Sequence, residues 1–89
     1  MSDLIKILLR RISPPLFTIR ITDRAAVLTA GQVTPALLRD WSEIARKNNI
    51  VCGWIWGLRT GSCIRLDFSS NISKNDRQRF RNIMAIHAK

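Results

Sequence analysis

Two apolar stretches separated by a short polar segment limit the folds open to this chain more than any other feature of its sequence. The stretches are residues 50–58 (IVCGWIWGL) and 63–68 (CIRLDF), and residues 59–62 (RTGS) lie between them. Apolar runs on either side of a short segment with Gly are typical of a β-hairpin. In the second run apolar residues alternate with Arg65 and Asp67, which predicts a strand with one buried and one exposed face.

The length of the hairpin loop decides which way the first strand faces, because both of its alternating sets of residues are apolar. A loop with an even number of residues, either 60–61 or 59–62, turns Trp54 and Trp56 away from the core. A loop of residues 60–62 would bury both indoles instead, since a shift of one residue exchanges the two faces of a strand.

We favour the even loop because of what it places opposite the glycines of the first strand. It pairs Leu66 with Ile55 in the core, and large residues then cover small ones: Ile64 lies opposite Gly57, and Phe68 lies opposite Gly53. A large side chain over glycine is a known way to fill one face of a sheet. The same pairing places Arg65 across from Trp56 on the outer face.

The charge of the chain points to an anionic partner. Its 89 residues contain 15 Lys and Arg against 6 Asp and Glu, for a net charge of +9, and 11 of the 15 cations are Arg. Arg forms planar contacts to phosphate and stacks on bases, which Lys does not. Nucleic acid, an anionic lipid surface and an acidic protein all fit such a charge.

Residues 1–13 (MSDLIKILLRRIS) form a separate N-terminal amphipathic segment. Their apolar residues recur at helical spacing and are interrupted by Lys6, Arg10 and Arg11. The segment is too short and too charged to span a bilayer, and it lacks the unbroken apolar core of a signal peptide. It is expected to form an optional helix that lies on a membrane surface, on a partner, or on its own domain.

Residues 14–89 are expected to form a single α+β domain. Strands are predicted at 16–22 and 25–29, with a turn at Asp23-Arg24, and Thr34-Pro35 begins a helix that presents Trp41 to the core. After the hairpin, Ser73 caps a last helix. The order ββαββα predicts a two-layer sandwich with a four-stranded antiparallel sheet and both helices on one face. The other face of the sheet is open on this prediction.

The end of the chain resembles a known family. Residues 61–69 (GSCIRLDFS) and 78–83 (QRFRNI) are similar to the close of a family of small bacterial proteins of unknown function, which end in an R-L-x-F-S strand and a Q-R-I-R-N-[VI] helix. The resemblance extends upstream to Gly31, Pro35 and the Gly53-x-Ile55 pair. It implies a shared fold but gives no information about activity, and it places Ile55 inside. Members often begin with a membrane-spanning segment, from which this short, charged N-terminus departs.

Nothing in the sequence indicates catalysis. The chain has one His, His87, and no Tyr, and it contains none of the nucleophile, phosphate-loop or zinc motifs. Cys52 and Cys63 lack the spacing of a zinc site, so neither a metal nor a cofactor is expected. Both cysteines are interpreted as reduced, which is typical of a cytoplasmic protein. The N-terminal helix leaves membrane association as the alternative.

The aromatic and basic residues give the functional prediction, a non-enzymatic module that binds single-stranded RNA or DNA. Exposed indoles stack on bases, and Arg neutralises the phosphates. The candidate residues are Arg20, Trp54, Trp56 and Arg65 on the sheet and Lys74, Arg77 and Arg81 on the last helix. A homodimer or a protein partner that uses the same face is the alternative, and so is an anionic membrane surface bound by the N-terminal helix.

Overall fold

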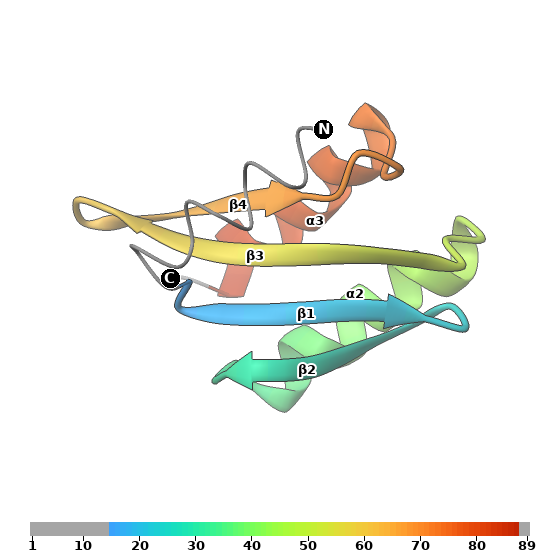
Figure 1. Cartoon of the computed structure of the whole chain (residues 1–89), viewed down its shortest axis with the longest axis horizontal. Helices are drawn as coiled ribbons and strands as arrows, with labels where there is room; N and C mark the ends of the chain where they lie inside the picture. The colour runs from blue at the N-terminus through green and yellow to red at the C-terminus, as the bar shows by residue number, and fades with distance from the viewer. Residues whose placement is uncertain (1–14, 88–89) are drawn as a thin grey trace.

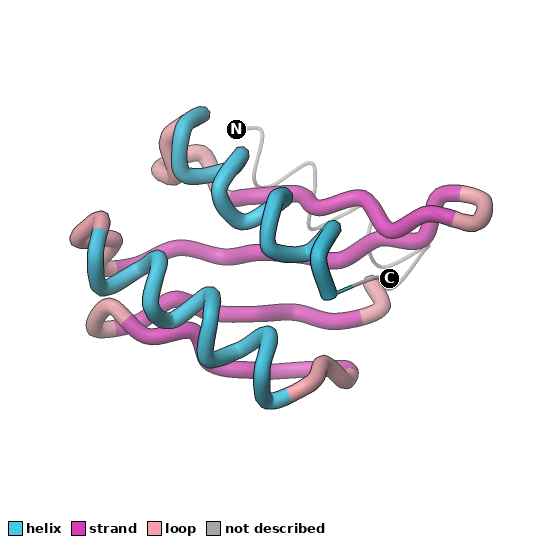
Figure 2. Tube along the Cα trace, turned by 180° about the vertical axis from the view of Figure 1, so that it is seen from behind, coloured by secondary structure: helices cyan, strands magenta, loops and turns pink. Residues whose placement is uncertain are grey.

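The computed structural model describes residues 15–87, and the predicted N-terminal helix at 1–13 lies outside them. The elements follow the predicted ββαββα order: β1 (Phe17–Thr22), β2 (Ala25–Gly31), α2 (Pro35–Lys47), β3 (Cys52–Thr60), β4 (Cys63–Phe68) and α3 (Lys74–His87). The strands form one antiparallel sheet in the order β2-β1-β3-β4 (Figure 1). Both helices pack on the same side of this sheet (Figure 2). The predicted α+β fold is confirmed.

The β1–β2 hairpin closes through the predicted turn. Asp23 and Arg24 have φ angles of 50° and 61°, and Thr22 pairs with Ala25. Positive φ at both central residues is the pattern of a type I′ turn, whose twist matches that of the flanking strands. β2 runs beyond the predicted end at Thr29, as far as Gly31, and a bulge between Thr18 and Ile19 shifts its register.

The β3–β4 hairpin has an even loop, but it is neither of the two that we expected. Thr60 pairs with Cys63, so the loop is Gly61-Ser62. Gly61 has a φ of 62° and Ser62 is not among the residues with positive φ, which is the pattern of a type II′ turn with Gly first. The faces of the strands are therefore as predicted, whereas the predicted pairing is wrong by two residues.

The shifted pairing changes which residues lie opposite one another. Leu66 faces Gly57, and Phe68 faces Ile55. On the outer face Arg65 lies opposite Leu58 rather than Trp56, which has Asp67 opposite it instead. The prediction that Arg65 lies across from Trp56 is wrong for this reason.

The core lies between the inner face of the sheet and the two helices. Its centre is Trp41 of α2, which is fully buried, and the indole Nε1 donates a hydrogen bond to the carbonyl oxygen of Phe80 at 3.2 Å. The rings of Phe17 and Phe80 lie 6.0 Å and 5.6 Å from the Trp41 ring. These contacts join β1, α2 and α3 into one cluster, in which burial of large aromatic rings supplies much of the stability.

Gly57 makes room for this cluster on β3. A Cβ atom built at Gly57 would come within 2.2 Å of the Phe17 ring, so any side chain there displaces the ring. Phe17 is also the residue of β1 that pairs with Gly57. The expectation that large residues cover glycine thus holds for Gly57, which is flanked by Phe17 on β1 and by Leu66 on β4.

We expect Gly57→Ala to lower the free energy of unfolding by about 1–3 kcal/mol, because the added methyl group overpacks the core against Phe17. Urea unfolding followed by tryptophan fluorescence measures the loss. In a Phe17→Leu background the same substitution should cost less, because the smaller side chain yields space. Equal costs in both backgrounds would mean that the contact with Phe17 is not what excludes a side chain at Gly57.

Candidate nucleic-acid interface

The outer face of the sheet carries the aromatic residues singled out in the sequence. Within the described part of the chain, 15–87, both helices lie behind the sheet, so neither covers this face (Figure 1). The pairing of β1 with β3 sets Arg20 beside Trp54 and Thr18 beside Trp56. These four side chains share the face because residues paired across antiparallel strands point to the same side.

Trp54 and Trp56 form an ordered aromatic pair. Their rings are nearly parallel, with an interplanar angle of 9° and centroids 6.3 Å apart. The guanidinium carbon of Arg20 lies 5.5 Å from the centroid of the Trp54 ring. A cation at this distance from an indole is attracted by the electron-rich ring face. Trp54 is therefore flanked by a second indole along its own strand and by a cation on the neighbouring strand.

The two indoles differ in their exposure to solvent. Trp54 is half-buried, whereas Trp56 is only 8% exposed. Trp56 lies on a central strand between Thr18 and Asp67, and the Trp54 ring stacks beside it along the strand. The expectation that both indoles face solvent therefore holds for Trp54 and is wrong for Trp56.

Arg65 lies at the margin of the same face. Its side chain is 63% exposed, and its Nη2 atom is 3.6 Å from Oδ1 of Asp67 on the same strand. Asp67 in turn is the residue opposite Trp56. The surface that contains the aromatic pair is thus bordered on β4 by one cation and one carboxylate.

The other three predicted residues lie in the helical layer. Lys74, Arg77 and Arg81 belong to α3, which packs on the opposite side of the sheet from Trp54 (Figure 2). The guanidinium carbons of Arg77 and Arg81 lie 5.8 Å and 5.3 Å from the ring centroid of Phe68, a core residue of β4. The seven candidates therefore form two groups on different layers, and only Arg20, Trp54, Trp56 and Arg65 share a surface.

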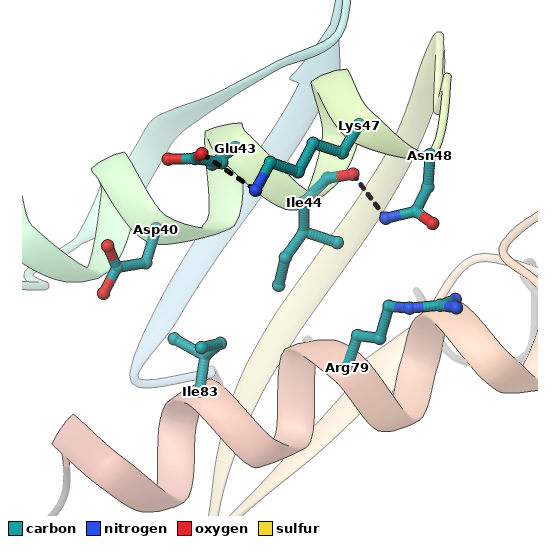
Figure 3. Close-up of a pocket in the computed structure, with 7 residues that line it drawn as sticks. All are labelled: Asp40, Glu43, Ile44, Lys47, Asn48, Arg79 and Ile83. Carbon is teal, nitrogen blue, oxygen red and sulfur yellow. Dashed lines mark hydrogen bonds and ion pairs between the residues drawn. The ribbon is translucent and has the colours of Figure 1, made fainter.

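A groove between the two helices also has charged groups (Figure 3). It has a volume of about 430 Å³, and its charged side chains are paired within the protein. Glu43 forms an ion pair with Lys47 at 3.2 Å, Asp40 contacts His87 at 2.8 Å, and Arg79 contacts Asp76 at 2.8 Å. Because these groups already satisfy one another, the groove offers no preformed ligand set.

Residues 15–87 contain no group of three or more His, Cys, Asp or Glu side chains placed to hold a metal ion. None of the helices in this part of the chain combines the length and the apolar character needed to cross a membrane.

Comparison with known proteins assigns the chain to a family. Residues 3–88 match the family described as "Protein of unknown function (DUF3634)". The chain belongs to this family. The resemblance to small proteins of unknown function noted in the sequence is thereby confirmed. No curated protein and no solved structure gives a significant match to the chain.

A polar network that was not expected from the sequence fixes the backbone of Trp54. The N–H of Trp54 donates to Oγ of Ser69 at 2.9 Å, and this hydroxyl donates to Oδ1 of Asn71 at 2.6 Å. Nδ2 of Asn71 then donates to the carbonyl oxygen of Cys52 at 2.7 Å. The signal in the sequence is the Ser-Ser-Asn run after β4, since these side chains readily bond to nearby backbone.

Arg77 of α3 also binds the loop that follows β4. Its Nε donates to the carbonyl oxygen of Ile72 at 2.8 Å, and its Nη2 donates to the carbonyl oxygen of Ser69 at 3.1 Å. Ile72 is buried, and its side chain lies against Gly53. Arg77 therefore joins α3 to the loop that follows β4, and its guanidinium is committed to backbone carbonyl groups of that loop.

We expect Arg77→Ala to lower the free energy of unfolding by about 1–3 kcal/mol, because it removes the hydrogen bonds that Arg77 donates to the carbonyl oxygens of Ile72 and Ser69. Arg79→Ala is the matched control on the same helix, and loss of its exposed pair with Asp76 should cost at most about 1 kcal/mol. Denaturant unfolding compares the two. If Arg77→Ala keeps full stability, Arg77 does not hold this loop.

Proposed function

We propose that the outer sheet face binds a single-stranded nucleic acid and that the protein has no catalytic role. The observation that carries the proposal is the half-buried indole of Trp54 with the Arg20 guanidinium 5.5 Å from its ring centroid. A partly exposed aromatic ring beside Arg on an open sheet is the arrangement by which single strands are held, with a base on the ring and a phosphate on the cation.

The two indoles have different roles in this proposal. Trp54 provides the surface on which a base stacks. Trp56 is 8% exposed, and its nearly parallel ring holds Trp54 in place. Arg65 contacts phosphate at the margin of the face, where its side chain is 63% exposed. One stacked base and two cations give a short site that does not select sequence by base-edge hydrogen bonds.

The remaining charge acts at longer range. Lys74 and Arg81 lie on α3, behind the sheet, and so do not contact a strand bound on the outer face. With a net charge of +9 they raise the local concentration of an anionic ligand and its rate of association. Arg77 is assigned to the fold because its donors bind the carbonyl groups of Ile72 and Ser69.

The absence of a catalytic role rests on how the nucleophiles and bases are placed. His87, the one histidine, contacts the carboxylate of Asp40 between the two helices. Cys52 and Cys63 are exposed, on β3 and β4, and His87 lies at the end of α3. General acid–base or nucleophilic catalysis needs such groups within hydrogen-bonding reach in one site.

Docking of a protein on the same face is the alternative function. The apolar side chains of Trp54, Trp56 and Leu58 lie along one side of β3 and favour it. The two functions respond differently to salt. Binding of nucleic acid weakens steeply as salt rises, because it releases counterions from the phosphates. A contact made by apolar side chains is little affected by the same change.

We expect Trp54→Ala to weaken the binding of oligo(U) by about 1–3 kcal/mol, or roughly fivefold to a hundredfold in Kd, because a base loses its stacking partner. Trp54→Phe should recover part of this loss. Fluorescence anisotropy of a labelled oligonucleotide, at about 50 mM salt where phosphate contacts are strongest, measures the binding. The unfolding free energy of each variant separates loss of binding from loss of fold.

Arg20→Ala should weaken binding to all sequences alike and lower the slope of log Kd against log salt by about one unit, because one phosphate contact is lost. Arg39→Ala is the matched control, since the Arg39 side chain is 76% exposed and belongs to α2, which lies on the other side of the sheet from the outer face (Figure 2). The proposal is wrong if neither RNA nor DNA binds at about 50 mM salt. It is also wrong if Arg39→Ala has the same effect on the slope as Arg20→Ala.

A further inference from the structure

β4 is an edge strand of the sheet that residues 15–87 form, and its pairing with β3 is regular. The strand order places β2 and β4 at the two edges of the sheet. β2 is paired through a bulge and ends at Gly31, which has a φ of 80°, and both features disturb a regular edge. β4 pairs with β3 without any shift in register, and its sequence, CIRLDF, contains no Pro. Its residues 63–65 are exposed.

The pairing with β3 determines which backbone groups of β4 point outward. The loop of two residues makes Thr60 and Cys63 a hydrogen-bonded pair, and such pairs recur at every second residue of an antiparallel ladder. The Ser69 N–H, which donates to the Trp54 carbonyl oxygen at 3.0 Å, continues this series. Ile64, Leu66 and Phe68 therefore direct their N–H and C=O groups away from β3, toward the edge.

The sequence of β4 is complementary to itself in one antiparallel register. When two copies are paired about Leu66, Arg65 lies opposite the partner's Asp67, and this ion pair occurs twice because of the two-fold axis. Pairing centred on Arg65 would set two Arg side chains opposite each other, and pairing centred on Asp67 would oppose two carboxylates. Like charges directly opposite are destabilising, so the register centred on Leu66 is favoured.

The inner face of β4 also suits this register. Ile64 is 39% exposed and, like Leu66, lines an open groove of about 510 Å³ along with Arg81, Met84 and Ala85 of α3. In the register centred on Leu66, Ile64 lies opposite the partner's Phe68. A β-branched residue paired with an aromatic residue stabilises a sheet, and the contact removes the exposed surface of Ile64 from water.

We propose that a second copy of this chain pairs with β4 in antiparallel orientation, centred on Leu66, and joins the two sheets into one. The proposal uses the edge of the sheet and not the surface of Trp54, and Arg65 is the residue that it shares with the proposed nucleic-acid site. Each copy carries +9, and the two charges repel. The association is therefore expected at ionic strengths above about 0.15 M, where the Debye length is below about 8 Å.

Charge reversal at the edge tests the proposal. Sedimentation equilibrium should give a mass that rises with concentration from 10.2 kDa toward twice that value. Arg65→Asp and Asp67→Arg should each weaken self-association about tenfold or more, because each places like charges opposite one another. A mixture of the two variants should associate again, since each Asp then faces an Arg. Arg39→Asp, with the same change in charge on α2, should associate as the original chain does.

Amide hydrogen exchange gives a second measurement that needs no variant. The amides of Ile64 and Leu66 should become more slowly exchanging as protein concentration rises, whereas the amide of Arg65 should not change, because it points toward β3. This measurement still decides the matter if Asp67→Arg does not fold. A mass of 10.2 kDa up to about 1 mM protein would overturn the proposal. Association by Arg65→Asp as strong as that of the original chain would overturn it too.

Discussion

The turn at Gly61-Ser62 determines the rest of the sheet. Its positive φ at Gly61 and its length of two residues fix the pairing of β3 with β4. Because a sheet places alternate residues on opposite faces, this pairing sends Ile55 into the core and Trp54 outward. One residue more or less in the loop would exchange the two faces. The same strand would then bury its indoles and expose Ile55.

The sequence predicted which residues of β3 and β4 face the core, but it did not predict the exact pairing of the two strands. The even loop followed from fitting large residues over glycines, and the observed pairing still sets a large residue, Leu66, opposite Gly57. That argument determines the face on which each residue lies, but it does not distinguish the observed loop from the two expected ones. The Gly-Ser pair has Gly at the first central position of a type II′ turn, and this signal selects the observed loop. The order of elements and the core position of Trp41 follow directly from hydrophobic periodicity.

The candidate site was only partly predictable, because a sequence does not tell which layer a cation belongs to. Lys74, Arg77 and Arg81 recur along one side of α3, a spacing that suits a phosphate clamp and a helix packed beside a sheet equally well. Arg77 donates to two carbonyl groups of the loop after β4, a role that depends on where that loop folds. The burial of Trp56 is likewise a property of the folded protein that periodicity along one strand does not reveal.

Arg65 is the residue at which the two proposed surfaces meet. Its guanidinium lies 3.6 Å from Asp67 within the chain, on the outer face and at the open edge. In the paired sheet it lies between its own Asp67 and the partner's Asp67, so less of its charge remains for a phosphate. Arg20, on β1 and away from the edge, keeps its place beside Trp54 in either state. Joining two sheets would thus leave the contact at Trp54 intact and present it twice on one continuous surface. A nucleic-acid strand long enough to reach both Trp54 sites would then bind more tightly, because binding at one site raises its effective concentration at the other.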